Sequence, residues 1–303
     1  MRTVILDTDP GTDDALALMM ALNSPDLRVE GVTTVGGNAS LTDTTDNAIR
    51  LVEYLDEERG AIPVAVGADR PVHGSFTHAY HVHGAGGLGV RLPAPTLKPH
   101  AMSAVEFICD RALQAVQPLT VIALGPLTNV AAALGSRPDL VDALAEVVVM
   151  GGAFEAPGNI TPHAEFNIHE DPEAANAVFA SGVLVTVVGL DVTRQTSMHR
   201  RDGPRWFEGE SRSAELGNRI LADRFQERAD LQEFYLHDPL AVAATIDPDI
   251  LTSRPAQVSV VTEGDERGRT VARYGGGTVK VAVDVDVERA VGIVRSLISD
   301  SQT

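Results

Sequence analysis

Short runs of β-branched and aliphatic residues alternate along this chain with segments of helical periodicity, and this alternation constrains the fold more than any other feature. Apolar runs with few polar interruptions are typical of strands that are buried on both faces of a sheet. The expected strands lie at 3–7, 28–35, 63–66, 119–124, 146–150 and 183–190. One helix is expected directly after the Pro-Gly turn at 10–11. Further helices are expected at 42–57, 103–116, 127–134, 172–180 and 238–245. We therefore predict an α/β fold with a mostly parallel, Rossmann-like central sheet flanked by helices.

The C-terminal part of the chain follows a different pattern. Segments 258–264 and 280–286 lie on either side of a glycine-rich turn at 275–277, and they predict a small antiparallel hairpin. No composition shift, internal repeat or low-complexity tract divides the 303 residues. With 44% hydrophobic residues the chain can bury one large core, so we expect a single domain over residues 1–303.

The composition restricts the possible partners. A formal net charge of −18 repels phosphate backbones and anionic lipid, so we expect neither nucleic acid nor a membrane as a partner. The apolar stretch after Met1 is too short for a signal peptide, and no run approaches the roughly eighteen apolar residues of a spanning helix. We expect a cytoplasmic protein that binds a small molecule. The single cysteine, Cys109, lies in an apolar helical pattern and is expected in the core.

Four carboxylates, Asp7, Asp9, Asp13 and Asp14, lie where the first expected strand meets the first helix. The helix dipole stabilises an acid in the first turn by about 0.3–1 kcal/mol, which does not neutralise four of them. Such a cluster is costly unless a cation lies within it, and all-oxygen ligands favour Ca²⁺ first and Mg²⁺ second. The spacing is not that of an EF-hand. The simpler alternative is a helix N-cap from Asp9 or Thr12 with solvated acids beside it.

The run DTDPGTDDALAL at 7–18 resembles the N-terminal signature of the inosine–uridine-preferring nucleoside hydrolase family. Further motifs follow in matching order over most of the chain. They are Gly37-Asn38, HGAGGL at 83–88, GPLTN at 125–129, MGG at 150–152, NITPHAEFN at 159–167 and HDPL at 237–240. The resemblance implies hydrolysis of the N-glycosidic bond of a ribonucleoside, giving ribose and free base in nucleoside salvage. It further implies Ca²⁺ as cofactor and a homodimer or homotetramer.

The resemblance also implies roles for individual residues. Asp9 would contact the metal and act as general base toward the attacking water, as oxocarbenium-like chemistry at the ribose requires. Asp14, Asp238 and the backbone carbonyl of Leu124 would complete the metal ligands, and His237 would protonate the departing base. The expected substrate contacts are Asp13 and Asn38 at the ribose, Asn159, Glu165 and Asn167 at its other end, His83 at the base, and Met150.

The nucleobase is expected to meet the charged segment 195–236, where the motifs are least familiar. Phe225, Tyr235 or Trp206 could stack on a base there, although aromatic side chains on helices more often pack in the core. Purine-specific relatives stack tryptophan on the base. With one tryptophan in the chain and His237 present, the inosine–uridine type fits better, and the choice between uridine and inosine stays open.

Two other functions were weighed against this one. A haloacid-dehalogenase-type phosphatase also places Asp-x-Asp after a strand, and Asp7-Thr8-Asp9 fits that half of its loop. Such an enzyme needs a lysine and a later acidic pair, whereas the only lysines are Lys98 and Lys280 and no such pair follows. The second alternative is a nucleoside- or ribose-binding protein without catalysis. The presence of Asp9 and His237 argues against that alternative.

Overall fold

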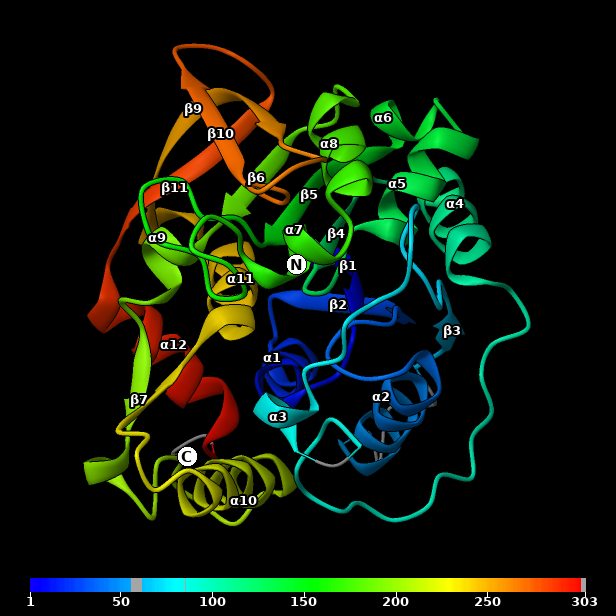
Figure 1. The fold of residues 1–303 in the computed structure, drawn as a ribbon. Helices are drawn as coiled ribbons and strands as arrows, with labels where there is room; N and C mark the ends of the chain where they lie inside the picture. Colours follow the sequence, from blue (N-terminus) through cyan, green and yellow to red (C-terminus); the bar gives the residue numbers. More distant parts are fainter. Residues whose placement is uncertain (56–61, 85, 301–303) are drawn as a thin grey trace.

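A mixed sheet of nine strands forms the centre of the computed structural model, which describes residues 1–55, 62–84 and 86–300. The strand order is β10-β9-β11-β6-β5-β4-β1-β2-β3, and neighbouring strands from β11 to β3 run parallel. The strands are β1 (Arg2–Thr8), β2 (Leu27–Thr34), β3 (Val64–Val66), β4 (Leu119–Ala123), β5 (Leu144–Met150), β6 (Val185–Val188), β9 (Leu251–Val260), β10 (Thr270–Tyr274) and β11 (Val279–Val285). The prediction of a single α/β domain with a mostly parallel sheet is confirmed (Figure 1).

Helices cover both faces of this sheet (Figure 1). They are α1 (Thr12–Asn23), α2 (Leu41–Leu55), α3 (Tyr80–His83), α4 (Ala104–Gln114), α5 (Thr128–Ser136), α6 (Leu140–Ala143), α7 (Phe166–Glu170), α8 (Pro172–Ala180), α9 (Leu190–Thr193), α10 (Arg212–Glu227), α11 (His237–Ile246) and α12 (Val287–Ile298). Val4 and Leu6 of β1 pack in one core with α1, α2, α10, α11 and α12. Ile5 packs in the other core with α4, α5, α6 and α8. Because successive side chains of a strand point to opposite faces, two cores require an uninterrupted apolar run.

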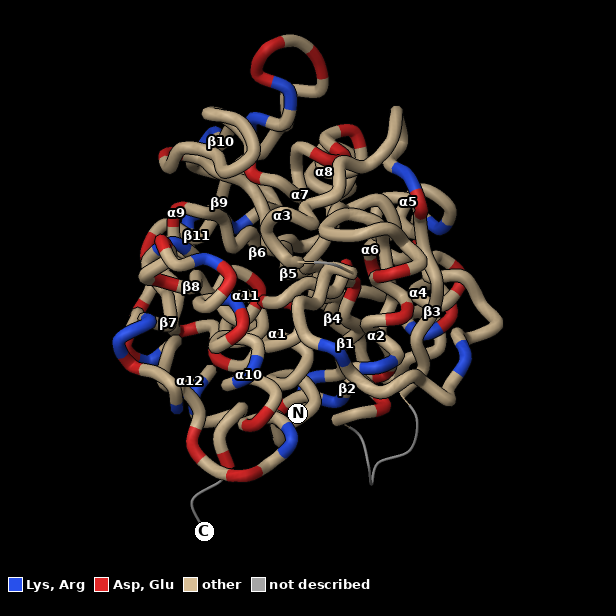
Figure 2. The backbone as a smooth tube through the Cα atoms, turned by 60° about the horizontal axis from the view of Figure 1, so that its bottom comes forward, with Lys and Arg blue, Asp and Glu red and all other residues tan. Residues whose placement is uncertain are grey.

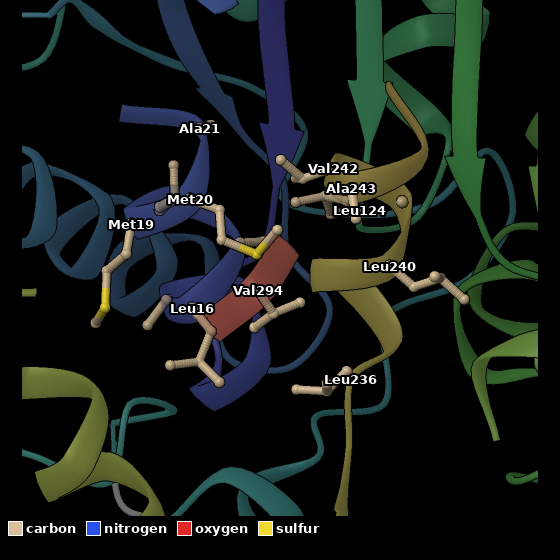
Figure 3. Close-up of a cluster of buried hydrophobic side chains, with 14 of the residues drawn as sticks. Leu16, Met19, Met20, Ala21, Leu124, Leu236, Leu240, Val242, Ala243 and Val294 are labelled. Carbon is tan, nitrogen blue, oxygen red and sulfur yellow. The ribbon is translucent and has the colours of Figure 1, made fainter. Parts of the chain in front are cut away.

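Helices α1 and α11 pack side by side although more than 200 residues separate them in the sequence (Figure 3). Leu16 and Met20 of α1 lie in one buried cluster with Val242 and Ala243 of α11 and with Val294 of α12. All five side chains are 0–1% exposed. This apolar contact fixes where the N-terminal ends of the two helices lie, and both ends carry aspartates.

The C-terminal antiparallel segment is larger than the sequence predicts. Strand β9 pairs antiparallel with β11 through residues 251–256, which precede the expected segment 258–264, and this pair extends the main sheet. Residues 258–260 pair instead with the unexpected strand β10 on the other edge of β9. A separate two-stranded antiparallel sheet joins β7 (Ser197–His199) to β8 (Glu233–Tyr235). The strand expected at 183–190 ends at Val188, and α9 follows it. Positions 56–57 of the helix expected at 42–57 lie outside the described residues.

Acidic and basic positions are interspersed over most of the elements (Figure 2). Many of the ion pairs are short-range surface contacts, such as Arg137 with Asp139 and Arg228 with Asp230. Within residues 1–55, 62–84 and 86–300, no helix has the length and apolar character needed to cross a membrane.

Candidate active site

The aspartates at the start of α1 and α11 meet at the edge of the sheet where the parallel strands end. Asp14 is fully buried, Asp238 is 3% exposed, and each lies in the first turn of its helix. One carboxylate oxygen from each of Asp13, Asp14 and Asp238 lies within 4.8 Å of the others. Acids from both ends of the chain therefore form one buried cluster, because α1 and α11 pack against each other.

Asp14 is held by hydrogen bonds from its own loop and from the loop after β2. It accepts the backbone N–H of Gly11 at 2.9 Å, the side-chain amide of Asn38 at 3.1 Å and the hydroxyl of Thr8. Gly11 is the N-cap of α1, so the alternative of a cap from Asp9 or Thr12 is wrong. The expectation of solvated acids is also wrong, because burial has removed Asp9 and Asp14 from water.

Asp9 lies beside this cluster at the end of β1. Its Oδ2 accepts the backbone N–H of Asn38 at 2.6 Å, whereas its Oδ1 is buried and has no hydrogen-bond partner among the described residues. A Cβ atom at Gly37 would lie 2.1 Å from the Asp9 carboxylate, and one at Gly125 would lie 2.6 Å from it. Both glycines therefore let the backbone approach the acid closely. An unsatisfied buried carboxylate oxygen in such a cradle indicates a missing ligand.

The electrostatics of the cluster also favour a cation. Burial, followed by the charge of Asp14, raises the pKa of Asp9 well above its usual range. Burial and the charges of Asp14 and Asp13 do the same to the pKa of Asp238. A hard divalent ion would relieve this repulsion, and carboxylate oxygens are the donors that such ions prefer. The residues therefore fit a divalent metal site. Asp13, Asp14 and Asp238 form its closest group of carboxylates, and the charge of Asp14 acts on Asp9 beside them.

The carbonyl of Leu124, at the end of β4, lies among the remaining expected residues. It accepts a hydrogen bond from Nδ2 of Asn167 at 2.7 Å, and the same amide reaches the carbonyl of Met150 at 3.3 Å. A carbonyl oxygen has two lone pairs, so this bond leaves one free for a further ligand.

Glu165 caps α7, whose first turn carries Asn167, and organises the loop that leads into this helix. Its carboxylate accepts the backbone N–H groups of Asn167 at 2.9 Å, Ile168 at 3.1 Å and Gly152 at 3.1 Å. Oδ1 of Asn159 similarly accepts the N–H of Phe166 at 2.8 Å. Both side chains line the pocket described next, so they can face a ligand while they hold the loop.

A pocket of about 280 Å³ opens in front of the cluster. Its size lies near the lower end of the range for small-molecule sites. Of the expected site residues, Asp9 and Asp14 lie outside its lining. Those that line it are Asp13, Asn38, His83, Leu124, Met150, Asn159, Glu165, Asn167, His237 and Asp238. Residues that line it without having been expected include Val82, Ile160, Phe166, Arg224 and Phe234. Phe166 and Ile160 lie within the expected 159–167 motif, whereas helical patterning gave no signal for Arg224.

Two histidines face the pocket as neutral rings. Burial, and then the charge of Arg194, lowers the pKa of His237 to about 4. The role of His237 in protonating the departing base stays a prediction. Nδ1 of His237 lies 2.7 Å from Oγ1 of Thr193. Nδ1 of His83 accepts the backbone N–H of Thr12 at 3.2 Å, so Nε2 of His83 carries its hydrogen.

Of the three aromatic candidates for stacking on a base, only Tyr235 lines the pocket, with its ring 5.7 Å from that of His237. Trp206 is 5% exposed and stacks on Phe225 at 5.4 Å, so these two pack in the core. Asn129 of the GPLTN motif joins the ends of β1 and β2. Its amide donates to Oδ1 of Asp7 and to the carbonyl of Thr34 at 2.8 and 3.0 Å.

Comparison with known proteins gives a consistent result. The family model of the inosine-uridine preferring nucleoside hydrolases matches residues 4–292. The pyrimidine-specific ribonucleoside hydrolase RihA of Salmonella paratyphi B is 40% identical over 295 residues, which cover 94% of each chain. A plant nucleoside hydrolase structure has a TM-score of 0.92 at 34% identity and covers 98% of this chain and 99% of its own. A purine-preferring ribonucleoside hydrolase from Gardnerella vaginalis has a TM-score of 0.90 at 33% identity, with 98% of both chains covered.

The match therefore extends over nearly the whole chain in sequence and in structure. The phosphatase alternative finds no support in these relatives. The chain belongs to the inosine-uridine preferring nucleoside hydrolase family, whose enzymes hydrolyse the N-glycosidic bond of ribonucleosides.

Proposed function

We propose that this enzyme is a Ca²⁺-dependent ribonucleoside hydrolase of the inosine–uridine type, which releases ribose and free base. One observation carries the proposal. Carboxylates from β1–α1 and from α11 converge beside a pocket that is also lined by Leu231, Phe234 and Tyr235. A ribonucleoside needs both kinds of surface, because it has a polar sugar and a flat base.

The proposed metal ligands are Asp9, Asp14, Asp238 and the carbonyl of Leu124, and the position of Asp13 makes it a further candidate. A bound divalent ion would act as a Lewis acid and lower the pKa of the attacking water. Asp9, whose Oδ1 lacks a partner, is positioned to accept the proton of that water.

The remaining polar residues are proposed to hold the sugar. Asp13 and Asn38 would accept and donate hydrogen bonds at the ribose hydroxyls near the cluster, and Asn159, Glu165 and Asn167 at the other end of the ring. Negative and amide groups placed around the ribose stabilise the positive charge that develops on it as the bond to the base breaks. Met150 contributes an apolar wall to the pocket.

The base is proposed to lie between His83, Tyr235 and His237. A neutral His237 donates a hydrogen bond to the departing base through Nε2 when Thr193 donates to Nδ1. The relatives are named as pyrimidine-specific and as purine-preferring, so family membership alone does not choose a base. The burial of Trp206 in the core supports the inosine–uridine type over tryptophan stacking.

The release of reducing sugar from a panel of nucleosides, with the free base identified by chromatography, tests the function. We expect turnover of uridine, inosine or both, and no phosphate release from phosphomonoesters. Nucleoside binding without turnover would instead support a catalytically inactive binding protein. A homodimer or homotetramer and a cytoplasmic location stay predictions, and light scattering of the purified protein tests the first of them.

A further inference from the structure

Arg224 places a buried positive charge at the base end of the pocket. It lies in the last turn of α10, its residue is 8% exposed, and it lines the pocket together with Leu231, Phe234 and Tyr235. Among the described lining residues it is the only arginine or lysine. The other formally charged groups there are the carboxylates Asp13, Glu165, Glu233 and Asp238.

The guanidinium of Arg224 has no close partner in the protein. Within the described ranges it makes no hydrogen bond, and its nearest paired carboxylate is Oε2 of Glu227 at 3.9 Å, on a side chain that is 52% exposed. Arg200, on the neighbouring segment, shows the contrast. Its guanidinium donates to the carbonyls of Leu231 and Arg228 at 2.8 and 2.7 Å. The guanidinium lines the pocket without a hydrogen bond to a described residue, so its N–H groups are available to a ligand that supplies acceptors.

The chemistry of arginine limits what that ligand can be. A guanidinium has five N–H donors, no acceptor and a permanent charge, so it selects oxygen acceptors that carry negative charge. Arg224 from α10 and His83 from α3 line the same pocket. The part of a nucleoside expected beside His83 is the base. Uracil and hypoxanthine present carbonyl oxygens there, whereas cytosine and adenine present amino donors at the corresponding positions.

We infer that Arg224 donates hydrogen bonds to O4 of uracil or O6 of hypoxanthine and stabilises the negative charge that the base acquires as it leaves, an inference that rests on the proposed hydrolase activity. In that step the water oxygen bonds to C1′ and its proton passes to the Asp9 carboxylate. The C1′–N bond breaks, and its electron pair moves to the ring nitrogen and is delocalised onto the carbonyl oxygen. A proton from solvent then returns the base to its neutral form. The preferred substrates are therefore ribonucleosides whose base carries a carbonyl oxygen at the O4 or O6 position.

Arg224→Met, Arg224→Gln and Arg224→Lys test this role, with Arg228→Gln as matched control. Arg228 lies four residues further on, pairs with Asp230 at 2.9 Å and does not line the pocket. Uridine, cytidine and 4-nitrophenyl β-D-riboside are the substrates. The nitrophenolate leaves as a stable anion without help from the protein, while its ribose uses the same carboxylates and the same water.

We expect Arg224→Met to lower kcat/KM for uridine by about 10- to 100-fold and to change 4-nitrophenyl riboside hydrolysis by less than about threefold. The ratio of uridine to cytidine turnover falls in the same variant, and Arg224→Lys recovers part of the loss. Circular dichroism and the thermal midpoint of all variants check folding, and Arg224→Gln serves if the methionine variant unfolds.

An equal loss with both ribosides would overturn the inference, because it would place Arg224 at the ribose or in the fold. An unchanged uridine-to-cytidine ratio would overturn it as well. A wild-type preference for uridine 5′-monophosphate that is lost in Arg224→Met would show that the arginine binds a phosphate instead. If the wild type cleaves no nucleoside at all, the proposed function fails with the inference. If the wild type cleaves uridine and Arg224→Met cleaves it equally well, only the inference fails.

Discussion

The two ends of the pocket are built in different ways. The proposed ribose end lies on the edge of the parallel sheet. Asp9 and Leu124 follow directly after β1 and β4, Asn38 lies in the loop after β2, and hydrogen bonds with backbone groups fix these residues. The base end is formed by the last turn of α10 and by β8 of the small separate sheet. Cleavage at the sugar needs catalytic residues in fixed positions, whereas different bases need different pocket residues around them. A rigid edge combined with a separate, smaller unit can supply both, and relatives named for different bases share this fold.

The largest effect that would test this contrast is removal of the metal from the ribose end. We expect exhaustive treatment with EGTA or EDTA to abolish turnover of uridine and of 4-nitrophenyl riboside alike, because both substrates need the same water. Addition of Ca²⁺ restores both activities and raises the thermal midpoint through mass action. Metal analysis of the treated protein is the control. Full activity in protein shown to be metal-free would contradict the metal-dependent mechanism.

Asp9→Asn is expected to lower kcat by roughly 10²- to 10⁴-fold, since an amide cannot take the proton of the attacking water. The fold survives, because the substitution keeps the shape of the side chain and removes a charge that burial and Asp14 destabilise. Steady-state kinetics and thermal unfolding measure the two effects. Asp69→Asn, at an exposed position paired only with Arg70, is the matched control and should change neither. Wild-type rates in Asp9→Asn would remove Asp9 from the role of general base.

The metal-free protein should lose stability as the pH rises. The folded-state pKa of Asp7 is raised to about 6 and that of Asp13 to about 7, both chiefly by burial, against about 3.9 in an unfolded chain. Between about pH 4 and pH 7 the folded state therefore binds more protons than the unfolded state, and the free energy of unfolding falls. Urea denaturation of chelated protein across this range measures the slope. Saturating Ca²⁺ should flatten it, and an equal slope with and without the ion would contradict a shared site.

The smallest expected effect lies at the base end. Thr193→Val removes the hydroxyl that contacts Nδ1 of His237, and the loss of about 1 kcal/mol in orienting the ring lowers kcat for uridine by about fivefold. Thr193→Ser should restore the rate. Thr245→Val removes a buried hydroxyl that bonds only to the helix carbonyl of Ala241, and it should leave kcat unchanged. An equal loss in both valine variants would indicate a general packing effect instead of positioning of His237.

The strands could be placed from the sequence because each one is buried on both faces and therefore reads as a continuous apolar run. The antiparallel edge was only half predicted, since Thr270–Tyr274 alternates exposed and buried positions and carries a weaker apolar signal. At the site, the four aspartates of segment 7–14 lie within eight consecutive residues, so the sequence alone places them near one another. Its hydrogen bonding was not predictable. The cap by Gly11 and the contact of Asn129 with Asp7 depend on neighbours from other loops.

The sequence by itself determined the α/β architecture, the acidic loop after the first strand and the motifs that mark the ribose end, because these depend on residues close together in the chain. Only the tertiary structure decided that Asp238 joins the N-terminal acids, that Trp206 is buried in the core and that Arg224 lines the pocket. The physical reason is that such placements follow from the packing of α1, α10 and α11 on the sheet. That packing results from many weak apolar contacts, so it cannot be predicted from any single residue of the sequence.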